Sequence, residues 1–270
     1  MIKHPHIVFG SAGPGDPDLV TIKLVECLGK SDCILVDRLV HPDILSRYAT
    51  PRAEIIFVGK QAYQKESTDQ QSINELLIEK ALAGKSVLRL KGGDVAIYSN
   101  VIDEIDAIKA HNITYQIIPG ITAASGAAAS LGIPLTGKGI APGVQLHSMS
   151  RKEDISEADY FYWAHSKDTL VYYMSISPLK SLVQGLITHG ASGDRPIAII
   201  EEATTPSQQT SVYTLQSFLN AHSELEFKSP SIVIIGDMIR EINISVIGQA
   251  ALQATFAPIH STTKSTIHVI

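Results

Sequence analysis

The chain has 270 residues, 44% hydrophobic and 18% charged, which is the composition of a folded globular protein, and its formal net charge of −5 argues against a nucleic-acid partner. No apolar run approaches the roughly 18 residues of a membrane-spanning helix, and the N-terminus runs directly into an expected strand with no signal-peptide core. Two cysteines, Cys27 and Cys33, are too few for a disulfide framework or a zinc site, so we expect a reduced, cytoplasmic protein with no metal site and no membrane contact.

Strand and helix patterns alternate through the first half of the chain. Apolar runs of strand length predict strands at 6–10, 32–37, 53–60, 86–94 and 113–120. Helical patterns follow them at 16–31, 41–49, 67–86, 101–112 and 121–134. Pro42 suits the first turn of the second helix, and Gly84 is placed to end the third. Strands spaced by helices predict a parallel sheet with right-handed crossovers.

A Gly/Pro-rich segment at 134–143 interrupts this rhythm, and we place a domain boundary there. Beyond it, strands are expected at 143–150, 169–175, 196–204 and 230–237, with helices at 178–190 and 214–225. We therefore predict two α/β domains, residues 1–136 and residues 137–245. Residues 246–270 form a tail with no clear period, to which no role is assigned.

Three glycine-containing loops follow strands of the first domain. They are GSAGPGDPD at 10–18, KGGD at 91–94 and PGITAASGA at 119–127. In a parallel sheet all three lie at the carboxyl edge, where open α/β sheets bind ligands, and glycine lets the main chain approach a ligand closely. A single loop of this kind is often only a tight turn, since isolated glycine motifs give frequent false positives. Three loops at one edge favour a ligand site.

The residues of the first loop disfavour a ligand that carries phosphate. Gly10, Gly13 and Gly15 do not have the G-x-G-x-x-G spacing of dinucleotide-binding proteins. Asp16 and Asp18 stand where a pyrophosphate would bind at a helix N-terminus. A ligand without phosphate, or with positive charge, fits better. S-adenosylmethionine has a sulfonium, an ammonium, a ribose diol and an adenine, and it has no phosphate.

Taken together, the motifs resemble those of the uroporphyrinogen-III C-methyltransferases, a branch of the tetrapyrrole methylases. The matching segments, in family order, are AGPGDPDLVTIKLVECLGKSDCILVDRLVHPDIL, LRLKGGD, PGITAASGAAASLGIPLT, TLVYYMS and EEATTPSQQT. The resemblance implies two α/β domains with S-adenosylmethionine in the cleft between them, and a homodimer as the usual assembly. The implied reaction is C-methylation of uroporphyrinogen III to precorrin-2, toward sirohaem and cobalamin, with S-adenosylhomocysteine as product.

The resemblance also implies roles for individual residues. Implied cofactor contacts are Pro14, Gly92, Gly93, Asp94, Ile97, Thr122, Ala123, Met174 and Ala203. Asp37 and Lys60 match the family's proposed acid/base pair, and both stand at the carboxyl ends of expected strands. From the residues alone, we would favour a helix cap or an ion-pair partner of Arg38 for Asp37, and a solvated strand end for Lys60; the resemblance favours the functional roles. A methionine such as Met174 is more commonly a core residue.

The segments expected on the acceptor side depart from the family pattern. After KGGD the family continues PFIFGRGGEE, whereas this chain has VAIYSNVIDE at 95–104, so Asn100 replaces an arginine that can pair with a carboxylate. The segment at 137–154 departs as well, and Ser11 stands where glycine is usual. Two further hypotheses therefore stay open: a methyltransferase of this fold with another acceptor, and a catalytically weak protein that binds a tetrapyrrole or the cofactor. A dinucleotide oxidoreductase is a distant fourth.

Overall fold

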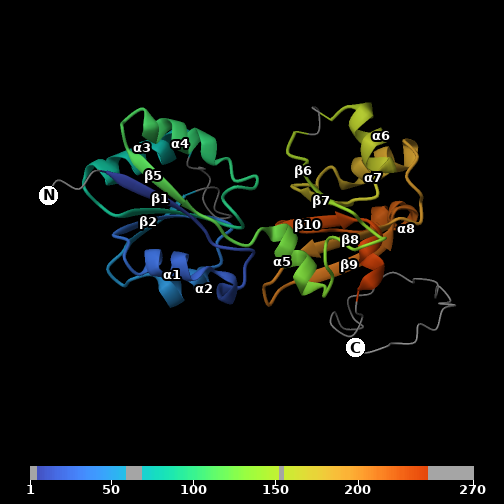
Figure 1. The fold of residues 1–270 in the computed structure, drawn as a ribbon, viewed down its shortest axis with the longest axis horizontal. Coiled ribbons are helices and arrows are strands. Elements are labelled where there is room, and N and C mark those ends of the chain that lie inside the picture. Colours follow the sequence, from blue (N-terminus) through green and yellow to red (C-terminus); the bar gives the residue numbers. More distant parts are fainter. Residues whose placement is uncertain (1–4, 59–68, 152–154, 243–270) are drawn as a thin grey trace.

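The computed structural model describes residues 5–58, 69–151 and 155–242. These residues form two α/β halves, each built on a five-stranded sheet (Figure 1). The α/β fold class with two sheets is confirmed. Lys60 and the tail at 246–270 lie outside the described residues.

The first sheet is parallel throughout and has the order β3-β2-β4-β1-β5. Its strands are β1 (His6–Ser11), β2 (Cys33–Asp37), β3 (Glu54–Val58), β4 (Val87–Lys91) and β5 (Thr114–Ile118). All five were expected from the alternation of strand and helix patterns. Since every strand runs in the same direction, the loops that follow them gather at one edge.

Helices cover both faces of the first sheet (Figure 1). The helices are α1 (Ile22–Leu28) and α2 (Pro42–Tyr48) on one face, and α3 (Gln70–Leu82) and α4 (Val101–Lys109) on the other. The start of α3 is fixed by the Asp69 side chain, which accepts a hydrogen bond from the amide of Ser72 at 2.7 Å. Ile73 and Leu77, four residues apart, then face the sheet, and Gly84 at φ +77° follows the last turn.

The second sheet is mixed and has the order β6-β7-β10-β8-β9. Its strands are β6 (Val144–Ser148), β7 (Thr169–Tyr173), β8 (Pro196–Glu201), β9 (Gln209–Thr214) and β10 (Ser231–Ile235). Only β6 and β7 run parallel, and the other neighbouring strands are antiparallel. The sequence patterns predict neither β9 nor the helix α6 (Glu157–His165).

Two helical layers enclose the second sheet. Helices α6, α7 (Leu179–Thr188) and α8 (Leu215–Ala221) cover one face, around the buried side chains of Trp163, Tyr172 and Phe218. The other face is covered by α5 (Ala123–Ser130), whose alanines pack on strand residues such as Ala198. The main chain of α5 can approach the sheet closely because its side chains are small. The domain boundary between residues 136 and 137 stays a prediction.

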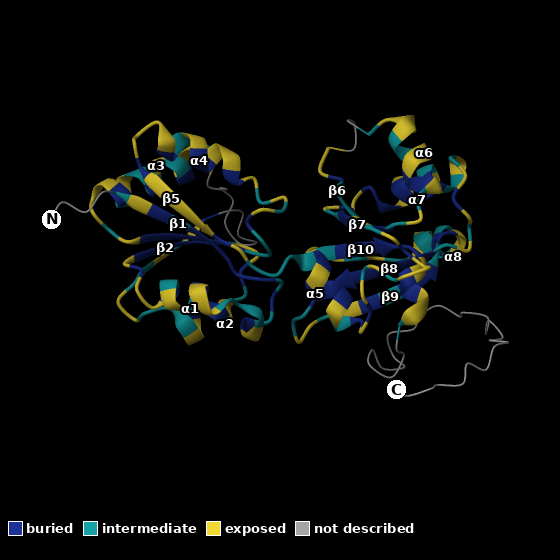
Figure 2. Ribbon diagram, in the orientation of Figure 1, coloured by how far each residue is buried: buried dark blue, intermediate teal, exposed yellow. Residues whose placement is uncertain are grey.

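Burial follows these layers, with the central strands buried and the outer helix faces exposed (Figure 2). Within the described ranges, no helix combines the length and the apolar character that crossing a bilayer requires. The same ranges contain no group of three or more His, Cys, Asp or Glu side chains placed to hold a metal ion.

Candidate active site

The three glycine loops meet at the carboxyl edge of the first sheet. Gly13 of the first loop and Gly93 of the second exchange two main-chain hydrogen bonds, with N···O distances of 3.0 and 2.7 Å. Their φ angles of +76° and +68° are readily adopted only by glycine. In the third loop, a Cβ on Gly120 would lie 2.6 Å from the Cβ of Ser11. The loops therefore form one connected surface.

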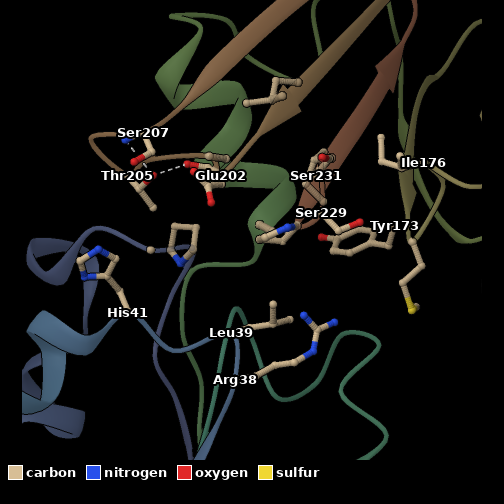
Figure 3. A pocket seen from close by; sticks show the side chains of 18 of the residues that line it. Arg38, Leu39, His41, Tyr173, Ile176, Glu202, Thr205, Ser207, Ser229 and Ser231 are labelled. Carbon is tan, nitrogen blue, oxygen red and sulfur yellow. Dashed lines mark hydrogen bonds between the residues drawn. The ribbon is translucent and has the colours of Figure 1, made fainter. Parts of the chain in front are cut away.

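A cavity of about 410 Å³ lies between the first glycine loop, the segment after β2 and the start of α5 on one side, and the strand ends of the second half on the other (Figure 3). This volume suits a small molecule, since such sites span roughly 300–1,000 Å³. Because β10 runs antiparallel to β7 and β8, its first residues meet their last residues at the cavity. The lining comes from residues within the segments 14–15, 38–42, 173–176, 200–207 and 229–232, together with Ala123.

Four of the expected cofactor residues line this cavity: Pro14, Ala123, Met174 and Ala203. Beside them, the Thr122 hydroxyl lies 2.5 Å from the hydroxyl of Tyr173, which is itself a lining residue. The structure therefore brings residues from four separate segments, and from both halves, around one space. Their role as cofactor contacts stays a prediction.

The two glycines of the KGGD loop lie directly behind the lining. A Cβ on Gly92 would lie 2.8 Å from the Cβ of the lining residue Leu39 and 3.0 Å from its carbonyl oxygen. A Cβ on Gly93 would lie 4.0 Å from the amide nitrogen of Ala123. Glycine at 92 is therefore required by close packing of this loop against the segment after β2.

Asp94 and Ile97 form the turn that follows these glycines. The Asp94 Oδ1 accepts a hydrogen bond from the Ala96 amide at 2.9 Å, and the Ile97 amide donates to the Asp94 carbonyl at 3.0 Å. The Ser11 hydroxyl, in turn, accepts from the Val95 amide at 2.9 Å. One carboxylate oxygen of Asp94 thus stabilises the turn, and cofactor binding by Asp94 and Ile97 stays a prediction.

Asp37 ends β2, and the next residue, Arg38, lines the cavity. The first turn of α2 is capped by His41, whose ring accepts a hydrogen bond from the amide of Asp43, so Asp37 is not the cap of that helix. In the part of the chain that the structure describes, no ion pair joins Asp37 to Arg38. The distance from Asp37 to Lys60 is not defined, because Lys60 lies outside that part.

The helical turn after the first loop has its N-terminus occupied by a side chain. The carboxylate of Asp16 accepts a hydrogen bond from the amide of Asp18 at 2.8 Å, at the start of the 3-10 helix Pro17–Leu19. A carboxylate at this position repels a phosphate from the amide groups that would otherwise bind it. The geometry therefore favours a ligand without phosphate, such as S-adenosylmethionine, over a dinucleotide.

A buried cluster of charges lies at the base of the second loop. Glu104 of α4 pairs with Arg89 at 3.0 Å and with Lys91 at 2.8 Å, and all three side chains are buried. Burial alone would raise the pKa of Glu104, but the two cations outweigh it and the net direction is downward. Burial and Arg89 lower the pKa of Lys91, while Glu104 and Asp37 oppose that change. The cluster fixes the end of β4, from which the KGGD loop begins.

Several lining residues have no counterpart among the sequence-based expectations. Tyr173, Arg38, Leu39 and Glu202 belong to this group. Glu202 and Met174 also have left-handed main-chain conformations, with φ +46° and +52°. Strain at non-glycine residues concentrates at functional sites, and it is not visible in a sequence pattern. For Tyr173 and Arg38, adjacency to Met174 and Asp37 was the available signal.

Comparisons with known proteins identify the family of this chain. The model of the tetrapyrrole (corrin/porphyrin) methylases matches residues 6–219. This chain belongs to the tetrapyrrole methylase family. A siroheme synthase of Hydrogenovibrio crunogenus is 39% identical over 229 residues, which cover 85% of this chain and 48% of that protein. A chloroplastic S-adenosyl-L-methionine-dependent uroporphyrinogen III methyltransferase of Arabidopsis thaliana is 42% identical over 229 residues, 84% of this chain and 62% of that protein.

Solved structures place this tetrapyrrole methylase in the same fold. The uroporphyrin-III C-methyl transferase of Thermus thermophilus, solved with S-adenyl homocysteine, is 28% identical with a TM-score of 0.74, covering 88% of this chain and all of that one. A cobalt precorrin-4 methyltransferase, at 24% identity and a TM-score of 0.76, shares the fold over 87% of this chain and 96% of its own. The chain spans about half the length of the siroheme synthases that it matches.

Proposed function

We propose that this chain transfers methyl groups from S-adenosylmethionine to carbon atoms of uroporphyrinogen III. The observation that carries the proposal is the cavity between the two halves, where Pro14, Ala123, Met174 and Ala203 come together. The names of the relatives support the acceptor, and the relative solved with S-adenyl homocysteine supports the cofactor. A role in sirohaem synthesis is supported by the siroheme synthases.

The residues of the cavity fit S-adenosylmethionine. Their hydroxyls and main-chain groups can bind a ribose and an adenine, and the carboxylate of Glu202 points into the space (Figure 3). Among the described lining residues, Arg38 is the single Lys or Arg side chain, so the cavity lacks the cationic cradle of a phosphate site. When bound, the cofactor supplies an electrophilic methyl group on its sulfonium.

The chain's own residues then have three tasks. The loops around Pro14 and the segment ending at Met174 position the cofactor and exclude water from it. Alignment of the acceptor carbon with the methyl group lowers the entropic part of the barrier. Asp37, at the end of β2, manages the proton that the acceptor carbon loses once its new bond to the methyl carbon forms, with Lys60 as its partner.

The test is to incubate the purified protein with labelled S-adenosylmethionine and uroporphyrinogen III and to follow label in the tetrapyrrole. We expect label transfer together with release of S-adenosylhomocysteine. Calorimetry should show binding of S-adenosylhomocysteine and none of NAD. Binding of NAD without binding of S-adenosylhomocysteine would overturn the cofactor, whereas cofactor binding without label transfer would overturn the acceptor.

A methyltransferase with a different acceptor is the second candidate, and Asn100 favours it. Asn100 occupies the N-cap position of α4 in a left-handed conformation, φ +54°, and its amide donates to Asp103 at 3.3 Å. No cation is therefore available at the position where the family pattern has arginine. Label transfer to another tetrapyrrole but not to uroporphyrinogen III would support this candidate.

We also propose a homodimer in the cytoplasm, which the resemblance to the family supports. Sedimentation equilibrium should give twice the mass of the 29.1 kDa chain. A monomer at micromolar concentration would contradict the assembly. Fractionation of the source cells, with the chain followed by antibody, tests the location.

A further inference from the structure

Tyr98 lies in the turn that follows the KGGD loop. The turn is fixed by the Ile97 amide, which donates to the Asp94 carbonyl at 3.0 Å, and by the Ala96 amide, which donates to the Asp94 side chain at 2.9 Å. Tyr98 itself has a left-handed main chain, φ +51°, which a residue with a bulky side chain rarely adopts. A conformation this unusual in a well-bonded turn indicates that the direction of the side chain matters.

The Tyr98 hydroxyl reaches the second half of the molecule. It donates a hydrogen bond of 2.6 Å to the main-chain carbonyl of Leu146 in β6. β6 ends the order of the second sheet, with β7 on its other side, so its outer row of main-chain groups has no neighbouring strand among the residues that the structure describes. Burial, aided by the nearby Tyr173, raises the pKa of the Tyr98 phenol, which therefore remains a donor at neutral pH.

The Tyr98 ring also rests on a lining residue of the cavity. Its centroid is 5.0 Å from that of Tyr173, with an angle of 57° between the rings. The Tyr173 hydroxyl is held by Thr122, at 2.5 Å, and by the amide of Ala124, at 3.1 Å. Tyr98, a residue of the first half, thus contacts the second half twice: its hydroxyl bonds to the middle of β6, and its ring lies tilted against Tyr173 at the end of β7.

Exposed apolar surface surrounds this connection. Leu39, Tyr98 and Met174 are 43%, 44% and 50% exposed, and they come from both halves of the molecule. Leu39 and Met174 line the cavity, and Tyr98 is adjacent to it through Tyr173. Apolar side chains left exposed beside a cavity are typical of a surface that a ligand covers. A flat macrocycle is a ligand that would bury all three.

We infer that Tyr98 is a positioning residue for the acceptor: its hydroxyl holds β6, beside the Tyr173 ring on which its own ring rests, in the arrangement that a planar tetrapyrrole contacts. The inference rests on the proposed function for the identity of the acceptor. The family pattern quoted above has phenylalanine at this place, four residues after the aspartate, so the hydroxyl and its bond to Leu146 are features of this chain.

The test is Tyr98→Phe, which keeps the ring and removes only the hydrogen bond. We expect hydrogen exchange to become faster in residues 144–148, because β6 loses its anchor. The KM for uroporphyrinogen III should rise about three- to tenfold, the range for one neutral hydrogen bond, while kcat and the Kd for S-adenosylhomocysteine change by less than about twofold. The matched control is Tyr115→Phe, which alters an exposed ring on β5 and should change neither quantity.

The outcomes separate the inference from the proposed function. If the unaltered protein does not methylate uroporphyrinogen III, the proposed reaction is wrong, and the Kd for uroporphyrinogen III then takes the place of KM in comparing Tyr98→Phe with the unaltered protein; an unchanged Kd overturns the inference. If hydrogen exchange in residues 144–148 is unchanged in Tyr98→Phe, the inference is wrong whether or not the variant is active. Faster exchange with an unchanged KM in an active enzyme also overturns it, because the bond would then be structural only.

Discussion

The two halves of this molecule contribute to the cavity in different ways. The parallel first sheet gathers its loops at one edge and lines the cavity with the first glycine loop and with residues 38–42 after β2, while a buried charge cluster lies at the base of the KGGD loop. The mixed second sheet presents side chains from strand ends, such as Tyr173 and Met174, and its described residues contain no buried ion pair. A parallel sheet brings every loop that follows a strand to one edge, whereas the mixed sheet brings the start of β10 beside the ends of β7 and β8 at the cavity.

The largest expected effect is on turnover and belongs to the first half. Asp37→Asn keeps the size of the side chain and removes its charge and basicity. If Asp37 manages the proton, the single-turnover rate should fall by about two to four orders of magnitude, while S-adenosylhomocysteine affinity changes little. Asp106→Asn, an exposed change on α4, is the control. A normal rate with a lowered melting temperature would remove Asp37 from the mechanism.

The buried charges of the first half should dominate its stability. Glu104→Gln leaves Arg89 and Lys91 buried without a countercharge, so we expect the free energy of unfolding to fall by about 3–5 kcal/mol. The exposed pair of Glu26 and Lys30 gives the matched control, since Glu26→Gln should cost about 1 kcal/mol or less. Urea denaturation measures both. Equal losses of unfolding free energy in the two variants would show that the buried cluster contributes no more than an exposed ion pair.

The same cluster predicts a pH dependence. The folded-state pKa of Glu104 is lowered, so its contribution is present above the ordinary pKa of a glutamate and is lost as pH falls through the lowered value. In Glu104→Gln, this loss of stability on acidification should be absent.

The close contact between the halves should set cofactor affinity. A Cβ on Gly126 of α5 would lie 2.6 and 2.7 Å from the ring carbons of Pro14, and a proline ring cannot move aside without its loop. We expect Gly126→Ala to weaken S-adenosylhomocysteine binding by about tenfold, or about 1.4 kcal/mol. Ser125→Ala, an exposed change one residue away, should leave it unaltered. Calorimetry showing equal affinities would mean that the position of Pro14 does not matter.

The smallest expected effect is on the pH dependence of stability, and it belongs to the second half. Burial against Trp163 and Tyr172 lowers the pKa of His147, with Asp159 opposing the change. Because the pKa of His147 is lowered in the folded state, the unfolded chain binds the proton more readily. The free energy of unfolding therefore falls as pH drops below about 6.5, by at most about 1.4 kcal/mol per pH unit. His147→Phe should flatten this slope relative to the exposed control His111→Gln. Identical slopes would contradict a lowered pKa of the half-buried His147.

The first half could be predicted from the sequence better than the second. Its central strands β1, β2 and β4 are mostly buried and rich in apolar residues, and Asp69 and Gly84 mark the limits of α3. The sequence patterns did not predict helix α6, because Phe161 and Tyr162 are 58% and 61% exposed and the helix therefore has no continuous apolar face. They did not predict β9 either, because this edge strand contains polar residues such as Gln209.

In the site, the resemblance to the family implied Pro14, Ala123, Met174 and Ala203 as cofactor contacts, and all four line one cavity. The resemblance did not identify Arg38, Leu39 or Glu202 as lining residues, because their placement depends on which strand ends meet across the two halves. No local pattern encodes that meeting. The contact of Gly126 with Pro14, between residues more than a hundred positions apart, is of the same kind.

The paired hydrogen bonds between Gly13 and Gly93 have a consequence for the thermodynamics of binding. They join two loops that are far apart in sequence into one rigid element before any ligand arrives. Fixing a residue's main chain costs roughly 1–2 kcal/mol of conformational entropy, and in these loops that cost is already met when the chain folds. Association with the cofactor then orders little new main chain, so more of the contact energy remains as affinity.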